Sequence, residues 1–267
     1  SSFSDIEPLL QSLAASPVAL VYLIDHSDKP HLLESELVGL PALRYHRHVN
    51  NGYGGGHNYA IRMAIEAGSD FHLVVNPDVW FGPEVVPQLV AFMQQHSQVG
   101  MLMPKVCFPN GSLQPLVKLL PTPLDLFGRF CLRGLFFGKR NARFELRHSG
   151  YSFPINAPYL SGCFMFLRLS ALAQVGLFDE RYFMYAEDID LTRRMHRCYQ
   201  TIFYPSVTIY HRFNRQSRRS LRLFFIHFTN IVRYFNRYGW FSDAERRLFN
   251  ERCLAEVRAH VSQSDNI

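Results

Sequence analysis

Two acidic clusters and a histidine contain the residue types from which this chain could build a catalytic site. Glu187 and Asp188 begin a predicted helix, whereas Asp78 ends an Asn-Pro-Asp tripeptide after a predicted buried strand. His211 follows another predicted strand. A carboxylate at the end of a strand suits Mg²⁺ or Mn²⁺, which prefer oxygen ligands and bridge phosphates. We therefore expect a divalent ion that holds a diphosphate and a carboxylate that deprotonates a hydroxyl.

Each of these residues also has a plainer structural interpretation. Asn-Pro-Asp is an ordinary turn sequence, and acidic residues in the first turn of a helix are often caps or helix-dipole partners. A lone histidine is usually structural, although an imidazole beside a carboxylate is a good metal ligand. The aromatic segment 182–185 favours the catalytic interpretation, because it places the acidic pair at the edge of a partly dry pocket where pKa values rise. No role is predicted for Asp190.

The glycine-rich segment 50–56 does not fit a dinucleotide-binding motif. The Gly-x-Gly-x-x-Gly frame that starts at Gly52 has His57 in its third glycine position, and the frame that starts at Gly54 has Tyr59 there. A Gly-Lys-Ser/Thr phosphate loop is also missing from the sequence. The segment predicts a flexible loop that leads into a helix, with backbone amides that could face a phosphate or a base.

Strands and helices alternate through the first hundred residues, which predicts a mostly parallel sheet covered by helices. In such sheets ligands bind beyond the carboxyl ends of the strands, where Asp25, Asn51 and Asp78 would lie. The predicted strands are 19–24, 42–46, 71–75 and 99–103, and the predicted helices are 6–13, 57–67 and 84–96.

The later part of the chain is less regular. We expect a hairpin turn at 108–112, a helix at 124–137, a loop at 139–158, and strands at 159–167 and at 201–210 that are interrupted at Pro205. The predicted helices that follow are 170–175, 187–198, 217–238 and 243–261.

The composition indicates a globular chain with an anionic partner. A chain of 267 residues, 48% hydrophobic and 19% charged, can bury one substantial core. Five scattered cysteines without a Cys-x-x-Cys pair argue against a zinc cluster or a disulfide framework and favour a reducing cytoplasm. A net charge of +6 suits a phosphate-bearing ligand, a membrane surface or a nucleic acid. No apolar run reaches the roughly 18 residues of a membrane-spanning helix, and no signal-peptide pattern precedes the first helix.

A series of motifs along nearly the whole chain resembles the family 2 inverting glycosyltransferases of the GT-A fold. The resemblance is greatest to the rhamnosyltransferase-like branch, which builds O-antigen and other bacterial surface polysaccharides. The motifs are Asp25 after a strand, Asn51-Gly52 with following glycines and Asn58, Asn76-Pro-Asp78, Ser161-Gly-Cys-Phe-Met-Phe, Gly176-Leu-Phe-Asp-Glu, Glu187-Asp188-Ile-Asp190-Leu, and His211.

The resemblance implies an α/β architecture, the GT-A fold, with a Rossmann-like, mostly parallel central sheet flanked by helices and followed by amphipathic C-terminal helices. Residues 1–105 would form the nucleotide-sugar-binding half, 106–215 the acceptor-binding and catalytic half of the same domain, and 216–267 a helical, membrane-associating segment. Because the chain starts at Ser1 close to a helical pattern, we expect that the first strand of this fold is missing.

The resemblance also implies a role for each motif residue. Asp188 would be the general base, and Glu187 would support it or bind the acceptor, which Gly162 would let approach closely. Asp78 and His211 would bind Mg²⁺ or Mn²⁺. Asp25 would recognise the base or ribose, and the other nucleotide-sugar contacts would be Asn51, Gly52, Asn58, Asn76 and Asp78.

The implied reaction moves a sugar, L-rhamnose from dTDP-rhamnose, to a hydroxyl of a saccharide carried on polyprenyl diphosphate, with inversion. Two alternatives stay open: a UDP-sugar donor, or an impaired family member that binds sugar nucleotide without turnover. Asn76, at a position where the family's metal motif has Asp, favours the second. Nucleic-acid binding rests on charge alone, because no recognised binding module is visible.

The tail 217–238 combines an apolar stripe with arginines. Two interpretations of this helix stay open: packing on the core, or resting on the anionic inner face of the bacterial cell membrane as a peripheral cytoplasmic protein. The stripe contains Leu221, Phe224, Phe225, Phe228, Val232 and Phe235, and its arginines are Arg218, Arg219, Arg222, Arg233 and Arg237. A second basic surface would come from Arg129, Arg133, Lys139 and Arg140.

Overall fold

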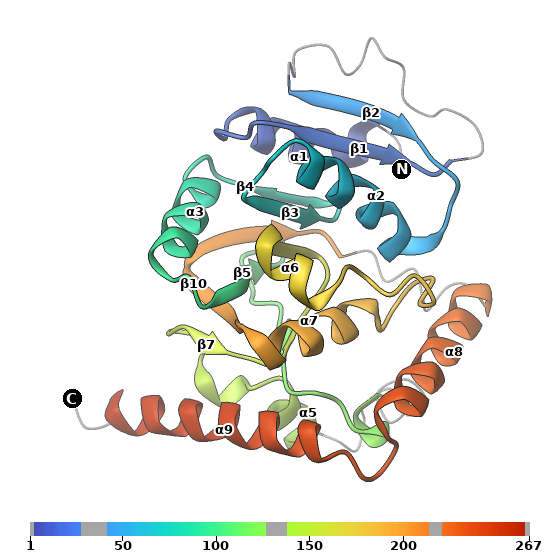
Figure 1. The fold of residues 1–267 in the computed structure, drawn as a ribbon. Coiled ribbons are helices and arrows are strands. Elements are labelled where there is room, and N and C mark those ends of the chain that lie inside the picture. Colours follow the sequence, from blue (N-terminus) through green and yellow to red (C-terminus); the bar gives the residue numbers. More distant parts are fainter. Residues whose placement is uncertain (1–2, 28–41, 127–137, 214–220, 265–267) are drawn as a thin grey trace.

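The structure is a computed structural model that describes residues 3–27, 42–126, 138–213 and 221–264. Its centre is a six-stranded sheet in the order β3-β9-β5-β10-β4, with β7 paired to β10 (Figure 1). These strands are β3 (Phe71–Val75), β4 (Val79–Phe81), β5 (Val99–Cys107), β7 (Ile155–Asn156), β9 (Phe164–Arg168) and β10 (Gln200–His211). Two small ladders complete the strands: β1 (Val21–Asp25) with β2 (Leu43–Arg47), and β6 (Val117–Lys118) with β8 (Tyr159–Leu160).

The strands that the alternating pattern predicted run parallel. β1 and β2 pair in parallel, and so do β5 and β10. Because β9 is antiparallel to both β3 and β5, the strands β3 and β5 also share one direction. The strands β4, β7 and β9 run the opposite way. β10 pairs with both β4 and β5, so the two predicted halves of the chain share one sheet.

Helices cover the sheet and extend beyond it (Figure 1). α1 buries the apolar side of its helical repeat, with Ile6, Leu9, Leu10 and Leu13 all buried. None of the helices within the described residues is both long and apolar enough to span a membrane. The helices are α1 (Phe3–Ala14), α2 (Gly52–Glu66), α3 (Val85–Gln95), α5 (Gly138–Phe144), α6 (Leu169–Val175), α7 (Glu187–Cys198), α8 (Leu221–Tyr238) and α9 (Ala244–Ser264), with a 3₁₀ turn at Arg147–Ser149.

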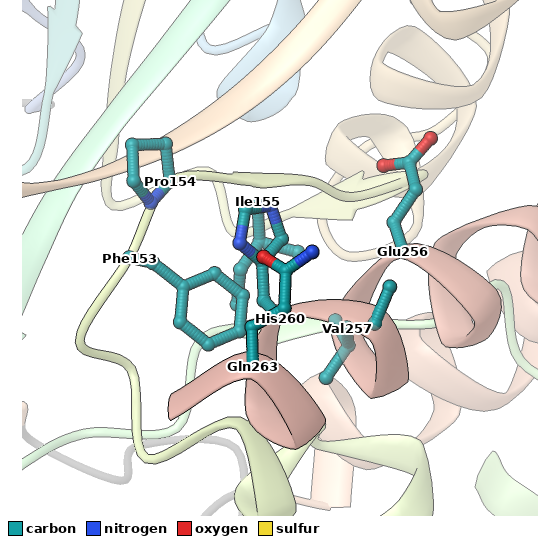
Figure 2. A pocket seen from close by; sticks show the side chains of 8 residues that line it. Phe153, Pro154, Ile155, Glu256, Val257, His260 and Gln263 are labelled. Atoms are coloured by element: carbon teal, nitrogen blue, oxygen red, sulfur yellow. The ribbon is translucent and has the colours of Figure 1, made fainter. Parts of the chain in front are cut away.

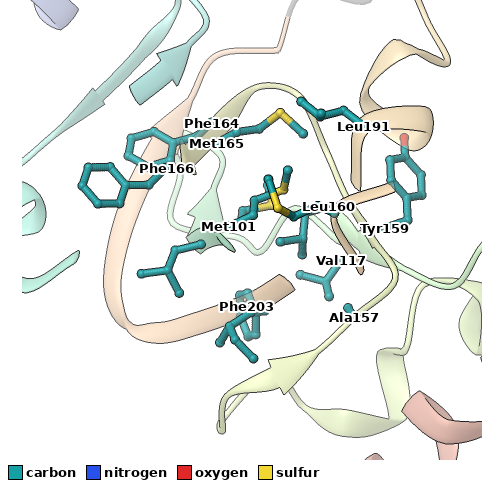
Figure 3. Packing of buried hydrophobic residues seen from close by; sticks show 14 of the residues in the cluster. Met101, Val117, Ala157, Tyr159, Leu160, Phe164, Met165, Phe166, Leu191 and Phe203 are labelled. Carbon is teal, nitrogen blue, oxygen red and sulfur yellow. The ribbon is translucent and has the colours of Figure 1, made fainter. Parts of the chain in front are cut away.

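The core lies where the sheet meets α7. Apolar side chains from β5, β8, β9, β10 and α7 pack together there (Figure 3). Met101, Leu160, Phe164 and Leu191 are all fully buried. Removing any of these side chains would leave a cavity, which typically costs about 2 to 5 kcal/mol. The floor beneath the acidic pair of α7 is therefore rigid.

Three predictions for local structure were wrong. α2 begins at Gly52, so the glycine-rich segment is the first turn of the helix and not a flexible loop. The segment predicted as a loop at 139–158 contains α5 and the 3₁₀ turn. β10 continues through Pro205, because a register shift between Tyr204 and Thr208 leaves the proline, which has no N–H to donate, out of the ladder. Most of the predicted helix 124–137 lies outside the described residues.

Candidate active site

The acidic pair lies at the first turn of α7, directly after a sharp reversal of the chain. Tyr185 and Ala186 both have left-handed backbone conformations, with φ of 70° and 72°. Such conformations are costly for residues other than glycine and recur at functional sites. Asp190 closes the first helical turn by donating its N–H to the Ala186 carbonyl at 3.0 Å. The reversal directs Glu187 and Asp188 back toward the end of β8.

Asp188 accepts hydrogen bonds on both of its carboxylate oxygens. Oδ2 accepts the Gly162 N–H at 3.0 Å and the Tyr159 hydroxyl at 3.3 Å, and Oδ1 accepts the Ile189 N–H at 2.8 Å. A Cβ on Gly162 would lie 3.2 Å from the Asp188 Cβ, so glycine permits this close approach. Burial raises the pKa of Asp188, although these bonds and the charge of Lys118 act in the opposite direction.

Glu187 has a different environment from its neighbour. The residue is 5% exposed, and its Oε2 atom has no hydrogen-bond partner. Burial, together with repulsion by Asp188, raises the pKa of Glu187 to about 8. At neutral pH the pair therefore consists of a neutral Glu187, which can donate a hydrogen bond, and Asp188, whose oxygens are solvated by donors that favour the anion.

The N-terminus of α2 packs against this pair. The Tyr53 hydroxyl donates a short hydrogen bond to the Gly162 carbonyl, and the Tyr53 N–H donates to the Phe183 carbonyl at 2.8 Å. Gly52 has φ of 86°, and a Cβ there would overlap the Phe183 carbonyl oxygen. Gly52 therefore lets α2 pack closely against the segment before α7.

Asp78 and His211 meet across the β4–β10 ladder. Asp78 Oδ1 lies 3.3 Å from His211 Nε2. The amide orientation of Gln114 decides the histidine tautomer, because Gln114 Nε2 donates to the carbonyls of His211 and Cys107 at 2.6 and 3.4 Å. Gln114 Oε1 must then accept from His211 Nδ1, at 3.0 Å, which leaves Nε2 directed at the carboxylate.

This geometry fits a divalent ion held jointly by protein and substrate. His211 Nε2 and the Asp78 carboxylate face each other, and an imidazole nitrogen and a carboxylate oxygen are both ligand types that divalent ions accept. Among the described residues, no three His, Cys, Asp or Glu side chains gather closely enough to hold a metal by themselves. Asp78 and His211 are the two groups of these types that the structure brings together at the β4–β10 ladder.

Asp25 lies at the end of β1, as predicted. Its carboxylate accepts hydrogen bonds from the Ser27 N–H at 2.8 Å, from the Ser27 hydroxyl, and from the Tyr45 hydroxyl at 2.6 Å. Burial acts to raise the pKa of Asp25, but these hydrogen bonds outweigh it and lower the pKa. Asp25 therefore stays anionic and rigidly oriented. Asn51 precedes α2 as its exposed N-cap residue, without a side-chain capping bond.

Asn58, which is predicted to contact the nucleotide, makes hydrogen bonds within the protein. Asn58 is 1% exposed, and its amide donates to the Phe178 carbonyl at 2.9 Å and to Glu180 Oε1 at 2.8 Å. Its Oδ1 accepts the Phe178 N–H at 3.0 Å. All of these partners belong to the Gly-Leu-Phe-Asp-Glu motif at residues 176–180, so Asn58 joins α2 to that motif. Asn76 likewise uses its N–H internally, toward the Cys163 carbonyl at 2.9 Å.

Sequence reasoning missed several residues that build the site. Tyr53, Tyr159 and Lys118 surround Asp188, and no motif marked them. Asp190 is fully buried and accepts hydrogen bonds from Arg194 at 2.7 Å, Arg237 at 2.9 Å and Tyr238 at 2.6 Å. The spacing of Asp190 and Arg194, four residues apart on one helix, was a signal for the first of these pairs.

A cavity of about 250 Å³ lies at the other end of the molecule, between α9 and residues 153–155 (Figure 2). It is lined mainly by apolar groups, including Phe153, Pro154 and Val257, with Glu256 and His260 beside them. The predicted site residues do not line it.

Comparison with known proteins gives this geometry a context. No family model matches the chain. An N-acetylglucosaminyl-diphospho-decaprenol L-rhamnosyltransferase of Mycobacterium tuberculosis is 34% identical over 174 residues, which cover 61% of this chain and 56% of the relative. The chain thus spans little more than half of that relative's length. Rhamnosyltransferase WbbL of Escherichia coli is 26% identical over 201 residues, which cover 71% of each chain.

Solved structures show the same fold. The mannosyltransferase PcManGT of Pyrobaculum calidifontis, in complex with GDP-Man and Mn²⁺, matches with a TM-score of 0.55 and 14% identity. The match covers 100% of this chain and 72% of that one. The expected α/β architecture of sugar-nucleotide transferases, with a central sheet flanked by helices, is therefore confirmed.

Proposed function

We propose that the chain is a family 2 glycosyltransferase of the GT-A fold and that it transfers a sugar from a nucleotide donor to a hydroxyl of a saccharide acceptor with inversion. The observation that carries this proposal is the environment of Asp188. Its carboxylate is held by Gly162 and Tyr159 at the end of β8, beside a carboxyl that keeps its proton. An anchored, partly desolvated carboxylate with a neutral neighbour is suited to accept a proton from a sugar hydroxyl.

The donor that we propose is dTDP-rhamnose, and the acceptor is a saccharide on polyprenyl diphosphate. Two relatives bear the name rhamnosyltransferase, and the name of the mycobacterial one describes a diphospho-decaprenol substrate. Because PcManGT was solved with GDP-Man, a different nucleotide sugar, the fold alone does not select the sugar. The product belongs to bacterial surface polysaccharide, O-antigen included.

The proposed reaction is a single displacement. Asp188 accepts the proton of the acceptor hydroxyl while the hydroxyl oxygen forms a bond to the anomeric carbon. The bond from that carbon to the diphosphate breaks, and its electron pair leaves with the nucleoside diphosphate. One displacement inverts the configuration. Glu187, neutral at pH 7, donates a hydrogen bond to a substrate oxygen from its buried Oε2 side.

Asp78 and His211 would hold a Mg²⁺ or Mn²⁺ ion together with the donor diphosphate. The ion supplies Lewis-acid stabilisation of the negative charge on the leaving group when it is bound. Gln114 contributes by holding the His211 ring in the tautomer that directs Nε2 at Asp78. Asp25, at the end of β1, and Asn51, before α2, contact the nucleoside in this proposal, with Asn76 beside Asp78.

We also propose that the chain acts at the anionic inner face of the cell membrane, through the first two turns of α8. Exposed apolar side chains gather there, and Arg222 adds an exposed positive charge. The exposed residues are Leu221 (79%), Phe224 (37%), Phe225 (63%) and Phe228 (41%). The rest of α8 packs on the core, with Ile231, Tyr234 and Phe235 buried.

Several basic residues of the predicted membrane surface form ion pairs or hydrogen bonds within the protein. Arg237 forms ion pairs with Asp179 and Asp190, and Arg233 donates to a backbone carbonyl and to Asn230. Arg140 is paired with Asp125 at 2.6 Å. These three arginines thus also make contacts within the protein. Arg129, Arg133, Arg218 and Arg219 lie outside the described residues.

A panel of nucleotide sugars tests the proposal. The protein is incubated with dTDP-rhamnose, UDP-sugars or GDP-mannose, an N-acetylglucosaminyl diphospho-lipid acceptor, and Mn²⁺ or Mg²⁺, and the release of nucleoside diphosphate and the glycosylated lipid are measured. We expect acceptor-dependent release that EDTA abolishes and that Asp188→Asn lowers by about 10² to 10⁴, the usual contribution of a general base. Nucleotide-sugar binding without transfer would identify an impaired, binding-only protein.

Asp188→Asn serves as a control only if it folds. Its thermal unfolding and its affinity for the nucleoside diphosphate should match those of the wild-type protein, because the amide keeps the shape of the carboxylate. If that variant, correctly folded, turned over at the wild-type rate, Asp188 would not be the base.

A further inference from the structure

A short ladder beside the acidic pair aligns a lysine with a tyrosine. β6 and β8 pair antiparallel with Lys118 directly opposite Tyr159, and the Lys118 Nζ lies 5.0 Å from the centroid of the Tyr159 ring. Cross-strand neighbours at this separation contact each other directly, and an ammonium over an aromatic face is attracted by it. The lysine is therefore stacked on the tyrosine ring.

The tyrosine connects this lysine to Asp188. Its hydroxyl donates to Asp188 Oδ2 at 3.3 Å, and its side chain is 8% exposed. Figure 3 shows Tyr159 at the edge of the packed apolar cluster. A row of three side chains thus leads from β6 through β8 to α7: Lys118, Tyr159 and Asp188. The positive charge of Lys118 acts to lower the pKa of Asp188, whereas burial acts to raise it.

The strand that bears Lys118 is firmly held. Asn250 of α9 binds both backbone groups of Leu120: its Oδ1 accepts the N–H at 2.7 Å, and its Nδ2 donates to the carbonyl at 2.9 Å. The Leu119 N–H donates to the Phe144 carbonyl at the end of α5 at 3.0 Å. Lys118 is half-buried, and its position follows from these anchors.

The other titratable groups that face Asp188 do not stabilise its anion. Glu187, on the same helix, adds negative charge whenever it ionises. Tyr53 on α2 has a pKa raised by burial, and burial also raises the pKa of the Cys163 thiol to about 12, so both stay neutral in the physiological range. Positive charge must come from elsewhere, and Lys118 provides it from β6.

We propose that Lys118 is a positioning residue for the reaction: stacked on Tyr159, it keeps Asp188 ionised and holds its carboxylate in the orientation in which it accepts the proton of the acceptor hydroxyl. This inference rests on the proposed function of Asp188 as the base. Lys118 itself touches no reacting atom. Its effect is exerted through the charge and the tyrosine hydroxyl, and the proton moves from the acceptor hydroxyl to the Asp188 carboxylate as before.

The proposal predicts a displaced pH profile. Lys118→Met keeps the length of the side chain and removes its charge, so Asp188 should hold its proton to higher pH. Since the ionised carboxylate is the active form, the acid limb of the kcat/KM profile should move upward by about one pH unit, within the usual effect of a nearby opposite charge. On the acid limb, kcat/KM of Lys118→Met should be about tenfold lower than that of the wild-type protein. At high pH the two values should be equal.

Three further variants separate charge, hydroxyl and surface effects. Lys118→Arg should keep the wild-type profile, and Tyr159→Phe should shift the limb in the same direction by less, because it removes one hydrogen bond. Arg252→Met removes a positive charge from the exposed face of α9 and should leave the profile unchanged. Thermal unfolding of each variant shows whether it is folded.

A second measurement does not depend on transfer. With ¹³C-labelled aspartate, the NMR titration of the Asp188 carboxylate, assigned with Asp188→Asn, should show a higher midpoint in Lys118→Met than in the wild-type protein. Equal midpoints would overturn the inference, and so would an unshifted limb with a raised KM for the donor, which would place Lys118 on the diphosphate. If the midpoint of Asp188 were shifted in Lys118→Met but the wild-type protein transferred no sugar, the proposed function would be contradicted and the inference about Lys118 would not.

Discussion

At the scale of single residues, the two adjacent carboxylates of α7 are distinguished by their donors. Asp188 receives three hydrogen bonds, two from backbone N–H groups and one from Tyr159, whereas Glu187 Oε2 has none. Two acidic groups whose surroundings favour different protonation states are suited to different roles in one reaction. We therefore assign proton acceptance to Asp188 and hydrogen-bond donation to Glu187.

Glu187 makes folding stability depend on pH in a defined window. Its carboxyl keeps its proton to about pH 8 in the folded protein but loses it near 4.5 when unfolded. The stabilisation is complete below about pH 4.5, and it is lost as the pH rises toward about 8. The slope reaches at most about 1.4 kcal/mol per pH unit for one proton. Asp188, whose pKa is also raised, adds to this slope.

Glu187→Gln copies the neutral carboxyl, so we expect a visibly flatter dependence of the free energy of unfolding on pH between 4.5 and 8. Urea denaturation at constant ionic strength measures this slope in both proteins. Stability near pH 5 should be similar in the two, because both side chains are then neutral. Parallel curves over the whole window would show that Glu187 is ionised in the folded state.

At the scale of elements, the glycine-rich start of α2 allows this helix to pack closely against its neighbours. A Cβ on Gly54 would lie 2.9 Å from the Phe178 Cβ, and a Cβ on Gly52 would overlap the carbonyl of Phe183. The glycines therefore let α2 approach the segment that leads into α7. This contact places Tyr53 against Gly162, next to the acidic pair.

Gly52→Ala should reduce the free energy of unfolding by about 3 kcal/mol, the sum of left-handed strain and steric overlap. It should also lower kcat, because Phe183 would shift and move α7. Gly68→Ala is the matched control: it has φ of 73° and nothing within 4 Å of its added Cβ, so it should cost only about 1 kcal/mol and leave kcat unchanged. Chemical denaturation and steady-state kinetics measure the two effects. Equal losses for both variants would refute the contact with Phe183.

Buried charges connect the helices behind the site. Arg193 is 2% exposed and pairs with Asp243 at 2.7 Å and with Glu245 at 2.6 Å, and Asp190 pairs with Arg194 and Arg237. Removing one partner from a buried pair typically costs about 3 to 5 kcal/mol, because the other charge stays buried alone. These pairs therefore specify how α8 and α9 dock against α7.

At the scale of the whole molecule, α8 has two halves with different surroundings. Its second half is buried beside α7, whereas its first half presents exposed leucine and phenylalanine side chains. Scattered exposed apolar residues are common, but a gathered aromatic set beside positive charge is typical of a surface that rests on anionic lipid. The net charge of +6 adds long-range attraction to such a membrane.

Leu221→Glu should weaken binding to vesicles that contain phosphatidylglycerol by about tenfold or more, since it removes an exposed apolar side chain that would insert into the lipid and adds charge repulsion. Leu248→Glu on α9 makes the same change at a residue that is 44% exposed and should leave binding unaltered. Co-sedimentation at low and high salt measures both, with phosphatidylcholine vesicles as the neutral reference. Binding of the wild-type protein that is equally strong to neutral vesicles would count against an anionic surface.

The periodicity of the sequence determined which segments are strands and helices in the first hundred residues, because alternating apolar runs report burial locally. It failed at the start of α2, where Gly52 and Gly54 are helical and pack against Phe183 and Phe178, residues distant in the sequence. It also failed at α5, whose polar sequence has no clear apolar stripe.

The sequence by itself determined the chemical inventory: a Glu-Asp pair at a helix start, an Asn-Pro-Asp turn and a distant histidine, in an order typical of one family. Only the tertiary structure decided the protonation, the orientation and the hydrogen-bond partners of these residues. It showed that Asn58 binds the segment 176–180, and that Tyr159, Lys118 and Gln114 are neighbours of Asp188 and His211. The physical reason is that protonation, tautomer and orientation depend on neighbours brought together by the sheet, and sequence spacing does not reveal those neighbours.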